Sequence, residues 1–165
     1  MGENMDKLTL NVGCGTRVFE EYPPGYKCIN YDERKLKEVN VVGDVRELGY
    51  PDECFDYILA SDIIEHFPIS QTKVVLSEWK RVLKIGGIIE FRMPNLRAIC
   101  DKYIKGTADA KLTSWLLFGG QDYIGNYHFV AFDREFFRSI IGPLGFTEIE
   151  YKPMNNNFEV KYKKD

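Results

Sequence analysis

Short apolar runs alternate with polar turns along the first half of this chain. The run at 8–12, Leu-Thr-Leu-Asn-Val, leads directly into a Gly-x-Gly turn at Gly13 and Gly15. Three further runs predict strands at 27–31, 39–43 and 55–60. The last of these, Phe-Asp-Tyr-Ile-Leu-Ala, is typical of a buried central strand in a parallel sheet.

The pattern then changes to a helical period. A helix is predicted from about Gln71, with Ser70 as its cap. Its apolar residues recur at helical spacing and share one face: Val75, Leu76, Trp79, Val82 and Leu83. We expect Gly86-Gly87 to end this helix and 88–92 to form the next strand.

The remaining third of the chain combines helices with a closing pair of strands. The pattern is helical from 94 to 118, and 119–132 is a loop rich in glycine and aromatic residues. Asp133 is predicted to cap another helix, which Gly142-Pro143 ends. Strands are expected at 146–152 and 158–163, and a connection this short makes them antiparallel. The chain is therefore expected to be an α/β protein with a parallel sheet and a C-terminal antiparallel hairpin.

Composition excludes several classes of function. A length of 165 residues, with 44% hydrophobic and 28% charged residues, suits one globular domain. A net charge of −3 without a dense basic run gives no reason to expect nucleic-acid binding. No apolar stretch approaches a membrane span, and the first residues lack a signal peptide, so we expect a cytoplasmic protein. The four cysteines form no Cys-x-x-Cys pair and are expected as reduced thiols, and no ligand cluster indicates a metal.

Polar residues follow the predicted strands at positions suited to a nucleoside. Gly13 and Gly15 allow a ligand to approach the backbone closely, although a tight turn needs glycine in any case. Asp32 can accept hydrogen bonds from a ribose diol, or it can stabilise the start of a short helix. Asp44 can accept from an adenine amino group, or it can be an ordinary turn residue. Because parallel strands end at one edge of a sheet, we expect these four residues to share one crevice.

Taken in order, these pieces resemble the class I S-adenosylmethionine-dependent methyltransferases, over nearly all of their core. The resemblance rests on Leu8–Thr16, Ile29–Asp32, Gly43–Val45, Phe55–Phe67 and Leu83–Gly87. It implies one Rossmann-like domain over 1–165, with a doubly wound, mostly parallel sheet of seven strands. It also implies an enzyme that uses S-adenosylmethionine, with 94–132 as a helical and aromatic insert on the substrate side.

The resemblance further implies where the donor binds. The glycine-rich turn would surround it through Asn11, Val12, Gly13, Cys14 and Gly15. Its ribose would lie on Asp32, its adenine beside Asp44 and Val45, and its methionine part near Ser61 and Asp62.

The sequence departs from the family pattern near its start. Asn11 stands where many members have an acid, and Arg17 where many have a third glycine. The first crossover is short and is broken by Pro23-Pro24. It leaves one sheet face thinly covered, from which we expect self-association as a homodimer.

Two histidines are candidates for catalysis. His66 follows the fourth predicted strand, and His128 lies in the aromatic loop. Either can be the base that a hydroxyl acceptor needs, and either can be a structural hydrogen-bonder. Glu65, Tyr123 and Tyr127 are candidates for contact with the acceptor. Aromatic rings can stack on a sugar, and the loop glycines suggest a lid.

Within the family, the small size and the segment Phe118–His128 resemble predicted methyltransferases of polysaccharide and surface-sugar biosynthesis. We therefore expect methyl transfer to a saccharide or small-molecule acceptor, at a hydroxyl oxygen. Two alternatives stay open. An NAD(P)-dependent oxidoreductase is disfavoured by Val18, which replaces the third glycine of the dinucleotide fingerprint. The other alternative is a non-catalytic nucleoside-binding module.

Overall fold

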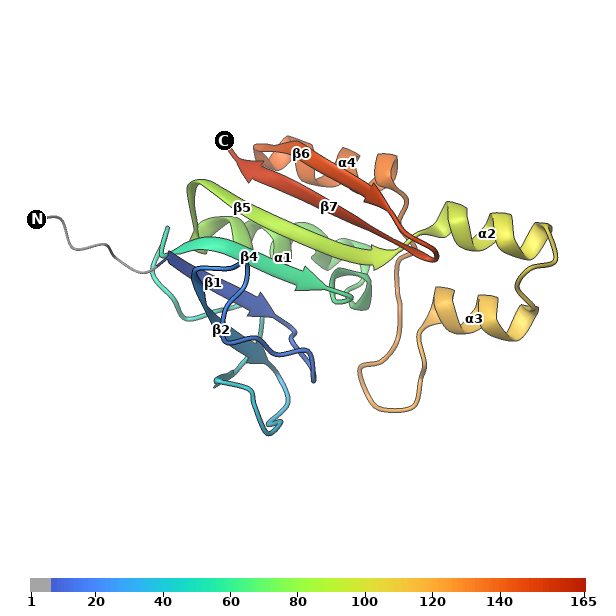
Figure 1. Cartoon of the computed structure of the whole chain (residues 1–165), viewed down its shortest axis with the longest axis horizontal. Coiled ribbons are helices and arrows are strands. Elements are labelled where there is room, and N and C mark those ends of the chain that lie inside the picture. The colour runs from blue at the N-terminus through green and yellow to red at the C-terminus, as the bar shows by residue number, and fades with distance from the viewer. Residues whose placement is uncertain (1–6) are drawn as a thin grey trace, which may run out of the picture.

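A single sheet of seven strands organises the molecule (Figure 1), which a computed structural model describes over residues 7–165. The strand order is β3-β2-β1-β4-β5-β7-β6. The strands are β1 (Lys7–Val12), β2 (Tyr26–Asp32), β3 (Val41–Val42), β4 (Phe55–Ser61), β5 (Leu83–Pro94), β6 (Phe146–Pro153) and β7 (Asn157–Lys164). The first five run parallel, and β7 is antiparallel to both β5 and β6. The predicted Rossmann-like sheet with an antiparallel C-terminal hairpin is confirmed. The N-terminal segment, on which the absence of a signal peptide was argued, lies outside the described residues.

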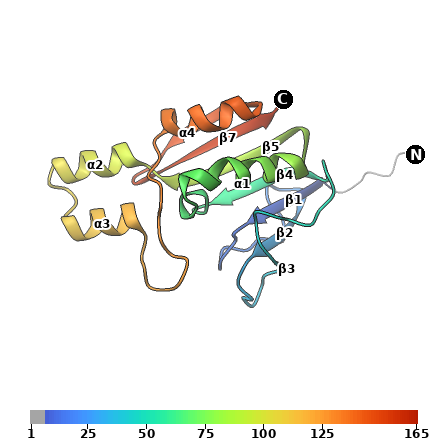
Figure 2. The ribbon, with the colours of Figure 1, turned by 180° about the vertical axis from the view of Figure 1, so that it is seen from behind.

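Four helices connect the later strands. They are α1 (Ile69–Val82), α2 (Leu96–Ile104), α3 (Ala110–Phe118) and α4 (Arg134–Ile141). Figure 2 shows α1 and α4 side by side on one face of the sheet, while α2 and α3 project beyond the end of β5. Two 3₁₀ turns, η1 (Ile64–His66) and η2 (Gly142–Leu144), complete the described elements. No helix in the described part of the chain is long and apolar enough to cross a membrane.

The core lies between the sheet and the helix pair. On α1, the predicted apolar face is fully buried at Val75, Leu76, Trp79 and Val82. Phe91 of β5 stacks on Trp79 and packs edge-on against a phenylalanine of α4. Each such side chain contributes about 1.5–3 kcal/mol by leaving water. This packing fixes β4 and β5, whose ends carry the candidate site.

The opposite face is covered by the segment 13–25 and by no described helix. Tyr22 of this segment donates a 2.8 Å hydrogen bond to Glu90 and packs edge-on against Tyr57. Tyr57 also donates to Glu90, so this buried carboxylate is held by two hydroxyls. The proline break that was predicted to prevent a helix here is confirmed.

The predicted N-cap of α1, Ser70, is wrong. The helix begins at Ile69, and its N-cap is Pro68 in an extended conformation. Ser70 makes no capping bond, because it lies inside the first turn with its side chain exposed. The Pro68 carbonyl instead accepts from the amides of Gln71 and Thr72 at 2.8 and 3.2 Å.

The role predicted for Gly86-Gly87 is also wrong. The helix ends at Val82, and both glycines lie within β5. The pairing of β4 with β5 shifts between Phe55↔Leu83 and Tyr57↔Ile88, which marks a bulge in β5. Gly86 has a φ of +74°, and a Cβ at Gly87 would lie 2.9 Å from the Lys84 carbonyl oxygen, so the bulge favours glycine at both positions.

The other predicted elements agree with the structure in kind. The region 94–118 forms two helices, and the side chain of Asp133 caps α4 by accepting from the Phe136 amide at 2.8 Å. The third strand is shorter than predicted, because only Val41 and Val42 pair with β2. All four cysteines are free.

Candidate functional site

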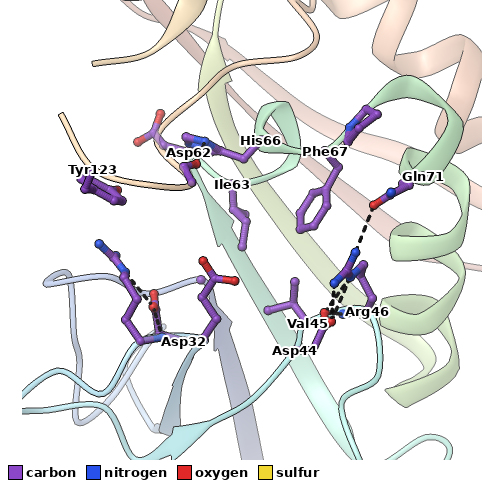
Figure 3. Close-up of a pocket in the computed structure, with 15 residues that line it drawn as sticks. Asp32, Asp44, Val45, Arg46, Asp62, Ile63, His66, Phe67, Gln71 and Tyr123 are labelled. Atoms are coloured by element: carbon purple, nitrogen blue, oxygen red, sulfur yellow. Dashed lines mark hydrogen bonds and ion pairs between the residues drawn. The ribbon is translucent and has the colours of Figure 1, made fainter. Parts of the chain in front are cut away.

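A pocket of about 370 Å³ lies at the carboxyl ends of the central strands (Figure 3). Seven of the predicted site residues line it: Gly13, Asp32, Asp44, Val45, Asp62, His66 and Tyr123. Figure 3 shows Asp32 and Asp44 on one side of the pocket, with Asp62 and His66 on the other. This size is within the usual range for a small-molecule site.

The turn after β1 reaches the pocket through Gly13, whereas Gly15, which was expected in the same crevice, lies outside the lining. Gly13 has a φ of +61°, and a Cβ there would lie 1.9 Å from Cδ1 of Ile63. Gly15 has a φ of +53°, and its amide donates a 2.8 Å hydrogen bond to Oδ2 of Asp32. Both backbone conformation and space therefore require Gly13, and the turn leaves bare main chain facing the pocket.

Asp32 is a buried carboxylate at the end of β2, with 3% of its surface exposed. Besides Gly15, it accepts from the amide and the Nε of Arg34 at 2.9 and 3.1 Å. An ionised carboxylate has about four acceptor positions, so capacity remains for a ligand hydroxyl. The Arg34 side chain is half-exposed, so a ligand hydroxyl can also replace its hydrogen bond to Asp32. Asp32 is thus suited to hold a diol.

Asp44 and Val45 lie beyond β3. Arg46 binds the Asp44 carboxylate through its amide at 2.8 Å and its Nη2 at 2.7 Å. The hydrogen bonds from the Arg46 guanidinium lower the pKa of Asp44, which stays ionised and half-exposed at the pocket. The Val45 carbonyl is fixed by a 2.9 Å bond from the Trp79 indole. This edge can accept hydrogen bonds from a ring amine.

The end of β4 presents a third carboxylate. Asp62 has a φ of +52°, pairs with Arg92, and accepts from Asn157 at 2.9 Å. Ser61 lies beside it but is outside the pocket lining, and its hydroxyl accepts from Arg17 at 3.0 Å. With Asp32 and Asp44, this gives an acidic site that suits a nucleoside carrying positive charge, as S-adenosylmethionine does.

Glu65, His66 and His128 form a cluster beside the pocket. Glu65 is 1% exposed, and its carboxylate has no hydrogen-bond partner among the described residues. Burial raises the pKa of this carboxyl to about 8. The two imidazole rings meet edge-to-face, 4.8 Å apart. Nδ1 of His66 lies 3.0 Å from the Gly125 carbonyl, and Nδ1 of His128 lies 3.2 Å from the Leu116 carbonyl.

Both histidines are neutral at pH 7. Burial lowers the pKa of His66, against the raising effect of the Gly125 and Tyr127 carbonyls. Burial, followed by the nearby His66 ring, lowers the pKa of His128 to about 4. A neutral imidazole at a pocket wall is able to accept a proton.

The aromatic loop reaches the pocket through one of its two predicted contact residues. Tyr123 lines the pocket and packs under the Arg34 guanidinium, 4.7 Å from the ring centre. Tyr127 is 42% exposed and is not part of the lining. The Phe129 amide donates to the Glu65 carbonyl at 2.8 Å, which holds the loop against η1.

Three residues predicted around the donor lie in the interior. Val12 is fully buried, and Cys14 is 5% exposed. The side chain of Asn11 donates to the Arg17 carbonyl at 2.8 Å and to Asn30 at 3.0 Å. Their side chains support the turn from beneath and do not line the pocket.

Eight lining residues were not predicted from the sequence: Glu33, Arg34, Arg46, Ile63, Phe67, Pro68, Gln71 and Gly125. Several of them directly follow a predicted site residue in the sequence. Their position just after a strand end could therefore have indicated them. Gln71 accepts a 3.3 Å hydrogen bond from Arg46, a contact between α1 and the β3 loop that spacing alone does not reveal.

Comparison with known proteins identifies this architecture. Residues 10–91 match the methyltransferase domain family. A structure from Pyrococcus horikoshii has a TM-score of 0.70 at 21% identity, covering 98% of this chain and 84% of that one. A SAM-dependent methyltransferase from Archaeoglobus fulgidus has a TM-score of 0.66 at 18% identity, with 96% of this chain and 86% of that one covered.

A third similar structure carries ligands. It is the Burkholderia thailandensis 1,6-didemethyltoxoflavin-N1-methyltransferase with bound 1,6-didemethyltoxoflavin and S-adenosylhomocysteine. Its TM-score is 0.68 at 13% identity, with 95% of this chain and 70% of that one covered. At sequence identities this low, the similarity shows that these structures and this chain have the same fold. Curated protein sequences give no match.

Proposed function

Because this chain belongs to the class I S-adenosylmethionine-dependent methyltransferases, we propose that it methylates a hydroxyl oxygen of a saccharide or another small molecule. Its methyl donor is S-adenosylmethionine. The observation that carries the proposal is the convergence of Gly13, Asp32, Asp44 and Asp62 on one pocket. The donor supplies an already activated methyl group. The protein therefore has to position the acceptor, exclude water and receive its proton.

Each side of the pocket supports one part of the donor in this proposal. Asp32 accepts from the ribose diol in exchange for its bond to Arg34 Nε. Asp44 and the fixed backbone at Val45 hold the adenine. The bare main chain at Gly13 and the carboxylate of Asp62 face the methionine part. For Asp44, the hydrogen bonds from Arg46 lower the pKa and so favour the ionised carboxylate that this assignment uses.

His66 is the residue we assign to the acceptor's proton. Its ring lines the pocket and is neutral, whereas His128 reaches the pocket only through contact with His66. A positioned base of this kind contributes about 10²–10⁴-fold to rate. In this assignment His128 positions the His66 ring and does not touch the acceptor.

The acceptor side consists of the segment 94–132. Figure 1 shows α2 and α3 projecting past the sheet, with the loop after α3 returning to the end of β5, and Tyr123 and Gly125 of this loop line the pocket. Large apolar side chains are exposed along this segment: Trp115, Phe118, Tyr123, Ile124, Tyr127 and Phe129. Exposed aromatic rings next to a donor pocket favour a ring-shaped acceptor such as a sugar.

The test is an acceptor screen with isotopically labelled S-adenosylmethionine and mass detection of products. Saccharides, phenols and amines are offered in parallel to the wild type and to His66→Asn. Labelled O-methyl saccharide, formed at least about tenfold more slowly by His66→Asn, supports the proposal. Exclusive N-methylation contradicts the hydroxyl acceptor. Tight donor binding without turnover on any pool favours the non-catalytic module instead.

Self-association is a separate part of this proposal. The face opposite α1 and α4 is covered only by the segment 13–25 and by no described helix, which favours a second copy as a further cover. Sedimentation equilibrium over a range of concentrations tests this, and a monomer at every concentration contradicts it.

A further inference from the structure

We propose that Glu65, His66 and His128 form a binding site for one divalent first-row transition-metal ion. One candidate ligand atom from each residue lies within 4.8 Å of those of the other two. The sequence predicted no metal, because His128 is 62 positions from His66 along the chain. Only the return of the aromatic loop to η1 brings the three together.

One of the three ligands, Glu65, is a buried carboxylate without a partner among the described residues. Glu65 is 1% exposed, and neither of its oxygens accepts a hydrogen bond in the described part of the chain. Glu90, the other glutamate that is buried among the described residues, accepts from the hydroxyls of Tyr22 and Tyr57. Buried carboxylates in proteins are paired, hydrogen-bonded or bound to a metal. A bound cation supplies the partner that Glu65 lacks.

The two imidazole rings are held by backbone carbonyls in the tautomer that a metal ligand needs. Nδ1 of His66 and Nδ1 of His128 each lie at hydrogen-bond distance from a backbone carbonyl. A carbonyl only accepts, so each Nδ1 carries the proton and each Nε2 keeps its lone pair. Metal-binding histidines are held in this way, with one ring nitrogen donating to a carbonyl and the other on the metal. The carbonyls of Gly125 and Leu116 therefore prepare both rings as ligands.

The donor set defines the class of ion. Two imidazoles and one carboxylate suit Zn²⁺, Co²⁺, Fe²⁺ and Mn²⁺ better than Ca²⁺ or Mg²⁺, which prefer oxygen. Three protein ligands leave at least one coordination position for water or another oxygen. His66 also lines the pocket, so an ion can enter from there.

The consequence for catalysis rests on the proposed hydroxyl acceptor. An acceptor oxygen bound to the open position loses its proton more easily, because the cation stabilises the alkoxide. With the ion present, Nε2 of His66 binds the metal and accepts no proton, so the proton of the acceptor hydroxyl passes to a water molecule and on to solvent before the methyl group is transferred.

The direct test uses tag-free wild-type protein, stripped with a chelator and labelled with ¹⁵N in its histidines. The chain has two histidines, so the four ring-nitrogen signals can all be assigned. We expect one equivalent of Zn²⁺ to shift both Nε2 signals while each Nδ1 remains protonated. Unshifted histidine signals, or gradual shifts without saturation near one equivalent, overturn the proposal.

Variants then identify the carboxylate ligand. Zn²⁺ titration calorimetry is compared for the wild type, Glu65→Gln and His128→Asn, with Glu90→Gln as a control that alters a buried glutamate elsewhere. We expect at least about tenfold weaker binding for the first two and unchanged binding for the control. Equal affinity in all four proteins overturns the site. The wild-type spectrum decides the matter if a variant fails to fold.

S-Adenosylhomocysteine binding to the same stripped samples separates this proposal from the proposed function. Donor-product binding without Zn²⁺ binding removes the metal site and leaves the methyltransferase assignment intact. Zn²⁺ binding without methylation of any hydroxyl keeps the site and removes the proposed acceptor.

Discussion

The amide of Gly15 donates a 2.8 Å hydrogen bond to Oδ2 of Asp32 and so joins the turn after β1 to the end of β2. This single bond links two of the elements to which donor binding is assigned. It also gives Asp32 two functions, because the carboxylate shapes the turn and faces the pocket.

Asp32→Ala should weaken S-adenosylhomocysteine binding roughly tenfold to a hundredfold. Hydrogen bonds to a charged group contribute about 1.5–3 kcal/mol, and this variant loses those to the ribose. Isothermal titration measures the change, with Asp101→Ala on the exposed surface of α2 as the control. Unchanged affinity with an intact circular dichroism spectrum would show that the ribose contact is misassigned.

Gly13→Ala should destabilise the protein far more than Gly49→Ala. Both glycines have positive φ, at +61° and +69°, where alanine is disfavoured by about 1–2 kcal/mol. Only at Gly13 does the new Cβ collide, with Ile63, whereas nothing lies within 4 Å at Gly49. Overpacking adds about 1–3 kcal/mol. Urea unfolding measures both variants, and equal losses would contradict the close approach of Ile63.

The aromatic loop should become resistant to chymotrypsin when S-adenosylhomocysteine binds. Tyr127 and Phe129 are exposed cleavage sites, and the neighbouring Tyr123 lines the pocket. A ligand that contacts Tyr123 reduces the opening that cleavage requires. Tyr103 of α2 is 52% exposed outside the pocket and serves as the internal control. Cleavage near residue 120 at the same rate with and without ligand would count against a lid.

Acid should remove the stabilising effect of Glu78. Its carboxylate accepts from Arg81 at 2.7 and 2.8 Å and from the Leu48 amide at 2.9 Å. The Arg81 hydrogen bonds lower the pKa of Glu78, so its stabilisation is present above the unfolded pKa and is lost as pH falls through the folded pKa.

Glu78→Gln should therefore reduce the free energy of unfolding by about 1–2 kcal/mol at pH 7, and by much less near pH 3. Urea unfolding at the two pH values gives this difference, with the exposed Glu47→Gln as the control. A loss that is the same at both pH values would mean that the ion pair does not contribute.

The sheet was predictable because its signals are local. Each parallel strand is a short apolar run, and the alternation at Phe158, Val160 and Tyr162 identifies the last strand. Local signals failed where the same residue serves two purposes. Gly86-Gly87 is a common helix terminator, yet here it accommodates a bulge that only the pairing of β4 with β5 creates.

In the candidate site, too, some features could be predicted from the sequence and others could not. Gly13, Asp32 and Asp44 follow strand ends, and topology alone brings them to one edge of the sheet. The contact between His66 and His128 depends on the path of a long loop, which no spacing in the sequence specifies. The unpartnered state of Glu65 depends on every neighbour that packs around it.

The segment between β5 and α4 leaves and rejoins the sheet at adjacent points. Asn95 pairs in a parallel bridge with Phe132, and the Leu96 amide donates to the Phe132 carbonyl at 2.9 Å. A chain excursion that closes on itself in this way can be lengthened, shortened or exchanged without moving the strands beneath it. A chimera that carries residues 96–131 of a relative should thus methylate the acceptor of that relative and still use the same methyl donor. The acceptor can change in the same way during evolution.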